Sequence, residues 1–321
     1  MDWRQLSHSG RCLYSQRLRG RSGKHSPWRI AGVLYLHRSA RASSRLPRMS
    51  LFTIIGASGF IGSSLASALR SRGHIVSAPA RKSTAIFRRP LGHVIFAAGV
   101  TADFRTRPYD TVRAHVCALT EILERSTYDS LLYLSSARVY RNSSDGTESA
   151  AFSIMPSDPE TFYDLTKLTG ESICMASRNP RVRISRLTNV VGDDFSSSNF
   201  LYDLIRSALM DQQIPLRSAL QSSKDYVLIE DVVDLLPRIC LAGTQRCYNV
   251  GGGKLITHAE IASVICAETG ASLTAPDDAA ISSSPNVSIS RAQLEFGFKP
   301  IPVLDAIPGL IKRFRKVATN D

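Results

Sequence analysis

A tyrosine and a lysine lie four residues apart in the segment "TFYDLTKLTGES", as Tyr163 and Lys167. In a helix, residues at i and i+4 lie one above the other, so the phenol and the ammonium would share a small space. A nearby cation favours the phenolate, and we therefore expect a tyrosine pKa below its usual value of about 10. Such a pair could donate and accept protons near neutral pH. The alternative is an ordinary helix surface, because this spacing is common by chance.

Three glycines, Gly56, Gly59 and Gly62, follow an apolar strand in "IIGASGFIG". The first would permit a tight turn, the second would let a pyrophosphate approach the backbone, and the third would allow close packing of helix on strand. A helix that begins here would offer free N–H donors and a partial positive charge to phosphates. The spacing is G-x-x-G-x-x-G, so it favours a dinucleotide site, with a purely structural turn as the alternative.

Strands and helices alternate along the chain from Met49 onward. The pattern predicts a parallel sheet with helices on both faces, a Rossmann-type α/β fold. After about residue 193 the alternation loosens into a smaller mixed α/β region. The strands that we expect are 51–56, 74–78, 93–99, 131–136 and 182–190, and the helices are 60–73, 108–126 and one that carries Tyr163.

The positive charge is concentrated at the start of the chain. Ten of the thirteen net positive charges fall in residues 1–48, which hold eleven Lys or Arg and one acid. This leader resembles a transit peptide in composition, and it could equally be a disordered basic arm. We favour a third interpretation, translated upstream sequence before a start at Met49, because a strand follows Met49 at once. The remaining charge is small, so nucleic-acid binding is not expected.

The rest of the composition indicates a protein of a reducing compartment. Six cysteines are scattered without C-x-x-C pairs, which argues against a disulfide framework or a zinc site. No apolar run approaches the roughly 18 residues that a membrane span needs. We therefore expect a cytoplasmic protein without a bound metal.

Together these features resemble the extended short-chain dehydrogenase/reductase family, which includes nucleotide-sugar epimerases, dehydratases and reductases. The resemblance covers residues 50–305. Its motifs occur in the family's order, as "GASGFIG", "VIFAAG" (94–99), "SSARVYR", "YDLTK", the R-x-x-N-x-x-G of Arg186, Asn189 and Gly192, "KDYVLIEDVV", "YNVGGG" (248–253) and "FGFKP" (296–300).

The resemblance implies roles for particular residues. It implies that Ser136, Tyr163 and Lys167 are catalytic and that Tyr140 is a structural aromatic. Asn189 and Lys224 would contact the substrate, with Lys224 in a position where arginine is usual. The cofactor would contact Gly56, Ser58, Gly59, Phe60, Ile61, Gly62, Arg81, Ala97, Ala98 and Gly99.

Three departures from the family pattern affect these expectations. Only about 14 residues separate the second strand from "HVIFAAG", where relatives have a further strand and helix. No acid lies near Ala80, where members that prefer NAD have one, and Arg81 follows. We therefore favour NADP(H), with NAD(H) as the alternative. His115 replaces the asparagine that is often found in the next helix, and a packed or surface histidine without a catalytic role is the favoured interpretation.

The resemblance implies an NAD(P)-dependent oxidoreductase or epimerase acting on a nucleotide-diphosphate sugar. Reduction of a keto-sugar is favoured, and dehydration is disfavoured because Ala137 and Arg138, not acids, follow Ser136. A non-catalytic dinucleotide-binding regulatory or scaffold protein is the alternative. A homodimer is left open. We expect a leader (1–48), a cofactor domain (49–193, with 225–250 returning to it) and a substrate-binding region (194–321).

Overall fold

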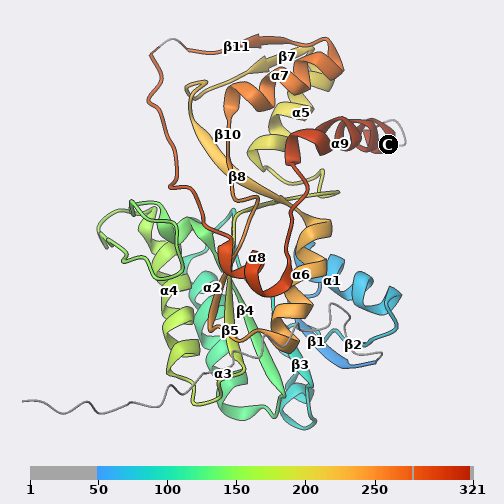
Figure 1. Cartoon of the computed structure of the whole chain (residues 1–321), viewed down its shortest axis with the longest axis vertical. Coiled ribbons are helices and arrows are strands. Elements are labelled where there is room, and N and C mark those ends of the chain that lie inside the picture. Colours follow the sequence, from blue (N-terminus) through green and yellow to red (C-terminus); the bar gives the residue numbers. More distant parts are fainter. Residues whose placement is uncertain (1–48, 277, 319–321) are drawn as a thin grey trace, which may run out of the picture. The chain divides into compact units, whose positions relative to one another are not determined.

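The computed structural model describes residues 49–276 and 278–318, and the predictions for the leader 1–48 lie outside them. A six-stranded parallel sheet forms the centre of the fold (Figure 1), in the strand order β2-β1-β3-β4-β5-β9. The predicted Rossmann-type sheet is confirmed. Its strands are β1 (Leu51–Ile55), β2 (Ile75–Ser77), β3 (His93–Phe96), β4 (Ser130–Ser136), β5 (Val182–Leu187) and β9 (Cys247–Val250).

Helices cover both faces of this sheet (Figure 1). On one face α1 (Phe60–Ser71) packs with α6 (Ile229–Ala242) in an apolar cluster. On the other face α2 (Pro108–Val112), the π-helical turn η2 (Arg113–Cys117) and α3 (Ala118–Arg125) form one continuous helical segment beside α4 (Thr161–Ala176). The predicted helix at 108–126 is confirmed, with a π turn in its middle.

The remaining elements build two smaller sheets and their helices. Strand β6 (Asn189–Val191) pairs with β8 (Ser223–Leu228), which also pairs with β10 (Leu255–Thr257). Strand β7 (Gln213–Pro215) pairs with β11 (Ser272–Thr274). The helices here are α5 (Phe200–Met210), α7 (His258–Thr269), α8 (Ser290–Phe296) and α9 (Val303–Ala318), and the short 3-10 turns of the chain are η1 (Thr84–Phe87) and η3 (Ala137–Tyr140).

Local sequence signals explain several element boundaries. Helix α1 ends before Gly73, whose φ of +82° suits a residue without a Cβ. Helix α7 begins with a capping box, in which Thr257 and Glu260 each bond the other's backbone N–H. Asn199 caps α5 by accepting a bond from the Leu201 N–H.

One predicted strand is wrong in its extent. The segment 182–190 was expected to be a single strand, but β5 ends at Leu187 and β6 begins at Asn189 in a different sheet. Thr188 lies between them, and its N–H still bonds the Val250 carbonyl. All six residues of β5 are buried, whereas in β6 only Val191 is. Val190 and Val191 nevertheless continue the apolar pattern, so periodicity gave no sign of the change of sheet.

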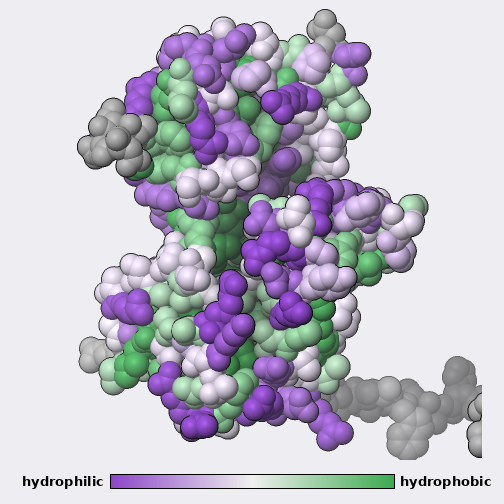
Figure 2. Space-filling view, turned by 180° about the vertical axis from the view of Figure 1, so that it is seen from behind, coloured by the Kyte–Doolittle hydropathy of each residue, from purple (hydrophilic) through white to green (hydrophobic). Residues whose placement is uncertain are grey.

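The large sheet and the smaller sheets have separate apolar cores. One cluster lies under α1 and α6, a second under α3 and α4, and a third among α5, α7 and α9. Figure 2 shows hydrophobic side chains gathered in the hollow between the part with the large sheet and the part with β7 and β11. The described residues belong to one compact unit, so the expected division at residue 193 stays a prediction.

Two further expectations concern what the described residues contain. None of the helices in residues 49–318 is long and apolar enough to cross a membrane. Five of the six cysteines lie in the described part of the chain, and all five are free thiols; Cys12 lies outside it.

Candidate active site

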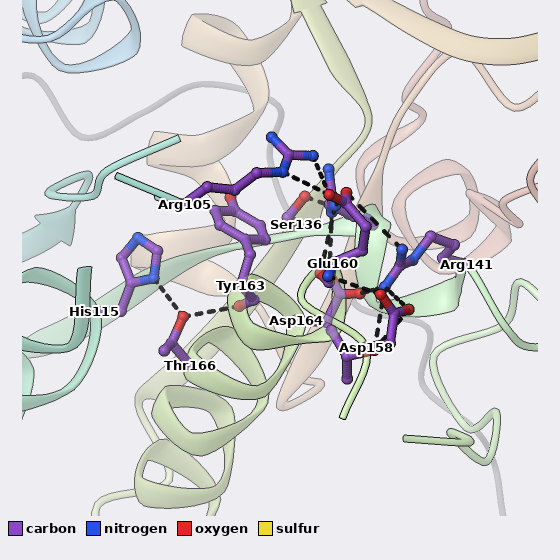
Figure 3. Close-up of polar contacts among 11 residues, drawn as sticks. Arg105, His115, Ser136, Arg141, Asp158, Glu160, Tyr163, Asp164 and Thr166 are labelled. Atoms are coloured by element: carbon purple, nitrogen blue, oxygen red, sulfur yellow. Dashed lines mark hydrogen bonds and ion pairs between the residues drawn. The ribbon is translucent and has the colours of Figure 1, made fainter. Parts of the chain in front are cut away.

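The parallel sheet brings the predicted catalytic residues together at the carboxyl end of one strand. Ser136 is the last residue of β4, and Tyr163 and Lys167 lie on α4, which packs against β4. Side chains at the carboxyl ends of parallel strands meet at one edge of a sheet, where α/β proteins bind ligands. Figure 3 shows Tyr163 pointing from α4 toward Ser136.

Ser136 is oriented by a backbone bond. Its Oγ accepts a hydrogen bond from the Arg138 N–H at 3.2 Å, at the start of η3. The hydroxyl hydrogen is therefore free to point elsewhere, and a Ser136–Tyr163 hydrogen bond favours the phenolate form of Tyr163. A serine held in this way can donate to an oxygen that gains negative charge.

Tyr163 is almost entirely buried, and its burial decides its pKa. Burial raises the pKa of Tyr163 to about 12, while the hydrogen bond from Ser136 and the charge of Arg138 act in the opposite direction. The expectation of a tyrosine pKa below 10 is wrong for the protein alone. The cost of removing a phenolate from water exceeds the stabilisation that its neighbours give.

Lys167 is buried as deeply as Tyr163. Its Nζ donates to the Leu134 carbonyl at 2.9 Å and lies 5.9 Å from the centre of the Tyr163 ring. Burial lowers the pKa of Lys167 to about 8. An exposed helix surface is thereby excluded as an explanation of the Tyr163–Lys167 pair, because their exposed fractions are 6% and 5%.

The glycine turn between β1 and α1 has the geometry that its spacing predicts. Gly56 has φ +88°, and a Cβ there would lie 2.6 Å from the Ala98 N. A Cβ on Gly62 would lie 2.2 Å from the Gly56 carbonyl oxygen. Gly59 differs, since a Cβ would meet only the Gly56 oxygen at 3.6 Å, an ordinary contact. Close packing leaves no space for a Cβ at Gly56 or Gly62, so both positions require glycine. At Gly59 the space that a Cβ would occupy is open to solvent.

That open side fits a bound pyrophosphate. Ser58 and Gly59 are exposed directly before α1, and Phe60 and Ile61 form its first turn, where backbone N–H groups lack helical partners. The turn after β3 lies beside the same edge, because Ala98 is the closest neighbour of Gly56. The glycine turn thus offers free N–H donors on a side that is open to a phosphate. The predicted cofactor residues at this edge are Gly56, Ser58, Gly59, Phe60, Ile61, Gly62, Ala97, Ala98 and Gly99.

Arg81 lies apart from these residues, in the exposed loop after β2. Because β2 is the edge strand beside β1, this loop leaves the sheet at the end where the glycine turn lies. Only the short turn η1 stands between β2 and β3, in agreement with the short connection noted in the sequence. The loop is thus open to solvent, and Arg81 remains a predicted contact.

The two predicted substrate residues lie on neighbouring strands of the three-stranded sheet. Asn189 on β6 is exposed, and its Nδ2 donates to the Asp225 carbonyl at 2.8 Å. Lys224 on β8 is partly buried, with its Nζ 4.9 Å from the centre of the Phe200 ring. Burial and the charge of Arg138 lower the pKa of Lys224. No carboxylate of the described residues forms an ion pair with Lys224.

Sequence reasoning missed a cluster of charged residues beside Tyr163 (Figure 3). The Glu160 carboxylate accepts from both Arg105 and Arg138, and the Arg138 guanidinium carbon lies 5.6 Å from the centre of the Tyr163 ring. The Phe104 ring contacts the Tyr163 ring at 5.4 Å. The sequence could have pointed to Arg138, because it follows the predicted catalytic Ser136 by two residues. Phe104 and Glu160 belong to loops without a recognisable pattern.

A buried ion pair supports the strand end that carries Ser136. Arg186 on β5 bonds both oxygens of Glu171 on α4, with one contact at 2.6 Å. Ser135 also donates to Glu171, and Tyr140 accepts from Arg186 at 2.7 Å. Tyr140 donates in turn to Asn249 at 2.8 Å. This network joins β4, β5, β9 and α4 behind the catalytic residues.

The sequence of residues 52–251 matches the NAD dependent epimerase/dehydratase family. The match spans more than half of the chain, and the protein belongs to this family. None of the curated proteins matches the chain.

Several solved structures match this chain over nearly their whole length. MoeE5 in complex with UDP-glucose and NAD is 20% identical, with a TM-score of 0.69, over 84% of this chain and 99% of its own. UDP-glucose 4-epimerase from Thermotoga maritima is 16% identical, with a TM-score of 0.70, over 83% and 99%. RMD from Pseudomonas aeruginosa, complexed with NADPH, is 20% identical, with a TM-score of 0.64, over 83% and 99%. At these identities the likeness establishes the fold alone.

Proposed function

We propose that the protein is an NAD(P)-dependent oxidoreductase that reduces a keto group on a nucleotide-diphosphate sugar, using Ser136, Tyr163 and Lys167. The observation that carries this proposal is the convergence of these three side chains at the carboxyl end of β4. Ser136 acts to lower the pKa of the phenol, and the buried ammonium lies 5.9 Å from its ring. A protein that only binds a dinucleotide has no use for all three groups.

In the proposed reaction each side chain has a separate task. A bound reduced nicotinamide would supply the hydride for the carbonyl carbon. Tyr163 donates its phenolic proton to the carbonyl oxygen, so the C=O becomes CH–OH. Ser136 donates a hydrogen bond to the same oxygen and stabilises its developing charge. Lys167 keeps a positive charge beside the phenolate that Tyr163 becomes.

The raised pKa of Tyr163 supports its role as a proton donor in the proposed reduction. With a pKa of about 12, the phenol holds its proton throughout the neutral range and begins the reaction as a donor. An alcohol oxidation would need the phenolate at the start, which burial disfavours. The charges of Arg138 and Lys167 would then stabilise the phenolate after proton transfer.

The open face of Gly59 and the exposed Arg81 support an NAD(P) cofactor, with NADP(H) favoured. Structures of the same fold are described with either form: MoeE5 with NAD and RMD with NADPH. An arginine after β2 suits a 2′-phosphate because its guanidinium offers several donors in a fixed arrangement. NAD(H) is the alternative cofactor.

Lys224 and Asn189 support a nucleotide-diphosphate sugar as the substrate. Lys224 has no carboxylate partner in the described residues, and its pKa is lowered, so an incoming anion would relieve an unpaired charge. The exposed Asn189 amide could bond a polar group of the same ligand. MoeE5 and the Thermotoga epimerase are both described with UDP-glucose. We expect no nucleic-acid partner and a cytoplasmic location, and we leave a homodimer open.

The proposal is tested by offering the purified protein a panel of nucleotide-linked 4-keto-sugars with NADPH or NADH. We expect loss of absorbance at the reduced-nicotinamide band with at least one sugar, and conversion of the keto-sugar to the alcohol. Cofactor binding without any turnover on the panel would favour the alternative, a regulatory or scaffold protein. Interconversion of two sugars without net consumption of NAD(P)H would favour an epimerase.

A further inference from the structure

His115 is a completely buried histidine in the middle of the π-helical turn η2. It lies edge-on to the Tyr163 ring, with 5.4 Å between the ring centres. A π turn carries one more residue per hydrogen-bonded ring than an α-helix, and such turns often occur at functional sites. Neither the mechanism above nor the sequence motifs give this side chain a task.

The hydrogen bonds around His115 determine which ring nitrogen carries the proton. Thr166 donates its only hydroxyl hydrogen to the Tyr163 carbonyl at 2.8 Å. Its Oγ1 therefore accepts from His115 Nδ1, 2.8 Å away, so Nδ1 carries the hydrogen. The other nitrogen, Nε2, is then free to accept from the Val100 N–H at 3.2 Å. All three bonds are satisfied by this one tautomer of a neutral imidazole.

The surroundings of His115 keep the ring neutral. Burial and the positive charge of Lys167 lower the pKa of His115 to about 2. Gly99 lies between the two side chains, since a Cβ there would be 3.0 Å from His115 Nε2 and 3.6 Å from Lys167 Nζ. Protonation would replace the acceptor for Val100 with a second cation beside Lys167. His115 is therefore a fixed hydrogen-bonding group at working pH, not a proton donor.

His115 thus connects two parts of the proposed site that are far apart in the sequence. One bond holds the turn after β3, at Val100, where the cofactor residue Gly99 lies. The other bond reaches α4 through Thr166 and ends on the backbone of Tyr163 (Figure 3). The chain of bonds from Val100 to Tyr163 therefore passes through the two nitrogens of one imidazole.

We propose that His115 is a positioning residue that holds the cofactor-facing turn Gly99–Val100 in register with the proton donor Tyr163, through Thr166. This inference rests on the proposed function of Tyr163 and of the turn. The hydride and the proton must reach the same carbonyl group, so the two parts of the site need a fixed separation.

Two substitutions separate the two bonds. An asparagine amide can place its nitrogen near the position of Nδ1, and a glutamine oxygen can reach the position of Nε2. His115→Gln should therefore keep the bond to Val100 and lose the bond to Thr166, and His115→Asn should do the reverse. We expect His115→Gln to bind NADPH within about twofold of the natural protein while kcat falls roughly tenfold or more, since about 1.4 kcal/mol corresponds to a factor of ten. We expect His115→Asn to weaken NADPH binding by a similar factor.

Further variants check the path of the bonds. Thr166→Val should lower kcat as His115→Gln does, and the double variant should be no worse than either, because both changes break one link. His93→Phe is the matched control, since it removes a histidine–serine bond at the other end of β3. It should leave cofactor affinity and kcat unchanged in the folded protein. NADPH affinity is measured by fluorescence titration and kcat on a sugar that the natural protein reduces.

The outcomes distinguish this inference from the proposed function. Unchanged cofactor affinity and kcat in folded His115→Gln, His115→Asn and Thr166→Val would overturn the inference alone. Equal losses of both quantities in the glutamine and asparagine variants would also overturn it, since a general packing defect predicts no division between them. Failure of the natural protein to bind either cofactor or to reduce any sugar would contradict the proposed function and the inference with it.

Discussion

Lys167 donates a hydrogen bond to the Leu134 carbonyl, and its ammonium lies 5.9 Å from the centre of the Tyr163 ring. The two side chains are one helical turn apart and both are buried against the end of β4. Their pKa values move in the directions that burial dictates: that of the phenol rises and that of the ammonium falls. At neutral pH the pair therefore begins as a neutral phenol beside a cation.

The rate of reduction should depend on pH through the protonation state of Lys167. Below its pKa of about 8 the amine is an ammonium, and above that value it becomes neutral and no longer stabilises the phenolate. We expect kcat/KM for keto-sugar reduction to be level near pH 7 and to fall about tenfold per pH unit on the alkaline side of the Lys167 pKa. A pH–rate profile measures this. A level profile up to pH 10 would contradict the role of the ammonium.

Arg81 should distinguish the two cofactors. Arg81→Ala should weaken NADPH binding about tenfold and leave NADH binding almost unchanged, because only NADPH has a 2′-phosphate for the guanidinium to bind. Ala80→Asp combined with Arg81→Ala should shift the preference toward NADH. Arg88→Ala, another exposed arginine of the same loop, is the matched control. Tighter binding of NADH than NADPH by the natural protein would refute the predicted preference.

Lys224 should contribute to binding of the diphosphate. Lys224→Met keeps most of the apolar stem and removes the charge, so UDP or GDP used as a probe should bind at least tenfold more weakly, in line with the ~1.5–3 kcal/mol of a bond to a charged group. Lys224→Arg should restore binding. Isothermal titration at two salt concentrations measures the effect. Lys312→Met on the exposed face of α9 is the control, and equal affinities for the Lys224 and Lys312 variants would exclude Lys224 from the site.

The ion pair between Arg186 and Glu171 should matter for stability. Glu171→Gln keeps the shape of the side chain but leaves the buried guanidinium without its counter-charge, and we expect the free energy of unfolding to fall by about 3–5 kcal/mol. Glu124→Gln on the exposed side of α3 should change it by less than about 0.5 kcal/mol. Urea unfolding of both variants makes the comparison. Similar urea midpoints for Glu171→Gln and Glu124→Gln would show that the Arg186–Glu171 ion pair does not contribute to the stability of the fold.

The sequence predicted the parts of the fold that depend on local pattern. Alternating apolar strands and helices identified the parallel sheet, and Gly56 and Gly62 lie where their lack of a Cβ is required. The change of sheet at Thr188 was not predictable from periodicity, because a single residue separates β5 from β6 and the apolar Val190 and Val191 continue the pattern.

The sequence predicted residues of the candidate site only where they belong to a recognisable motif. Motif spacing placed Ser136, Tyr163 and Lys167 together, but the pKa of Tyr163 could not be predicted from its neighbour Lys167. Burial by Phe104 and the rest of the surrounding chain outweighs the effects of Ser136 and Arg138 on this pKa, and burial is a property of tertiary structure. The bond between His115 and Thr166 joins residues 51 positions apart, so it too becomes visible only in the folded chain.

Tyr163→Phe removes one hydroxyl and tests the central claim most directly. Phenylalanine fills nearly the same space, so the fold and NADPH binding should be retained, and Tyr109→Phe on the exposed surface of α2 serves as the control. The measurement is kcat on a nucleotide sugar that the natural protein reduces, with folding checked by circular dichroism. Loss of a proton donor predicts a fall of roughly 10²–10⁴-fold in Tyr163→Phe and none in Tyr109→Phe. Retention of most of the activity by Tyr163→Phe would contradict the assignment of Tyr163 as the proton donor.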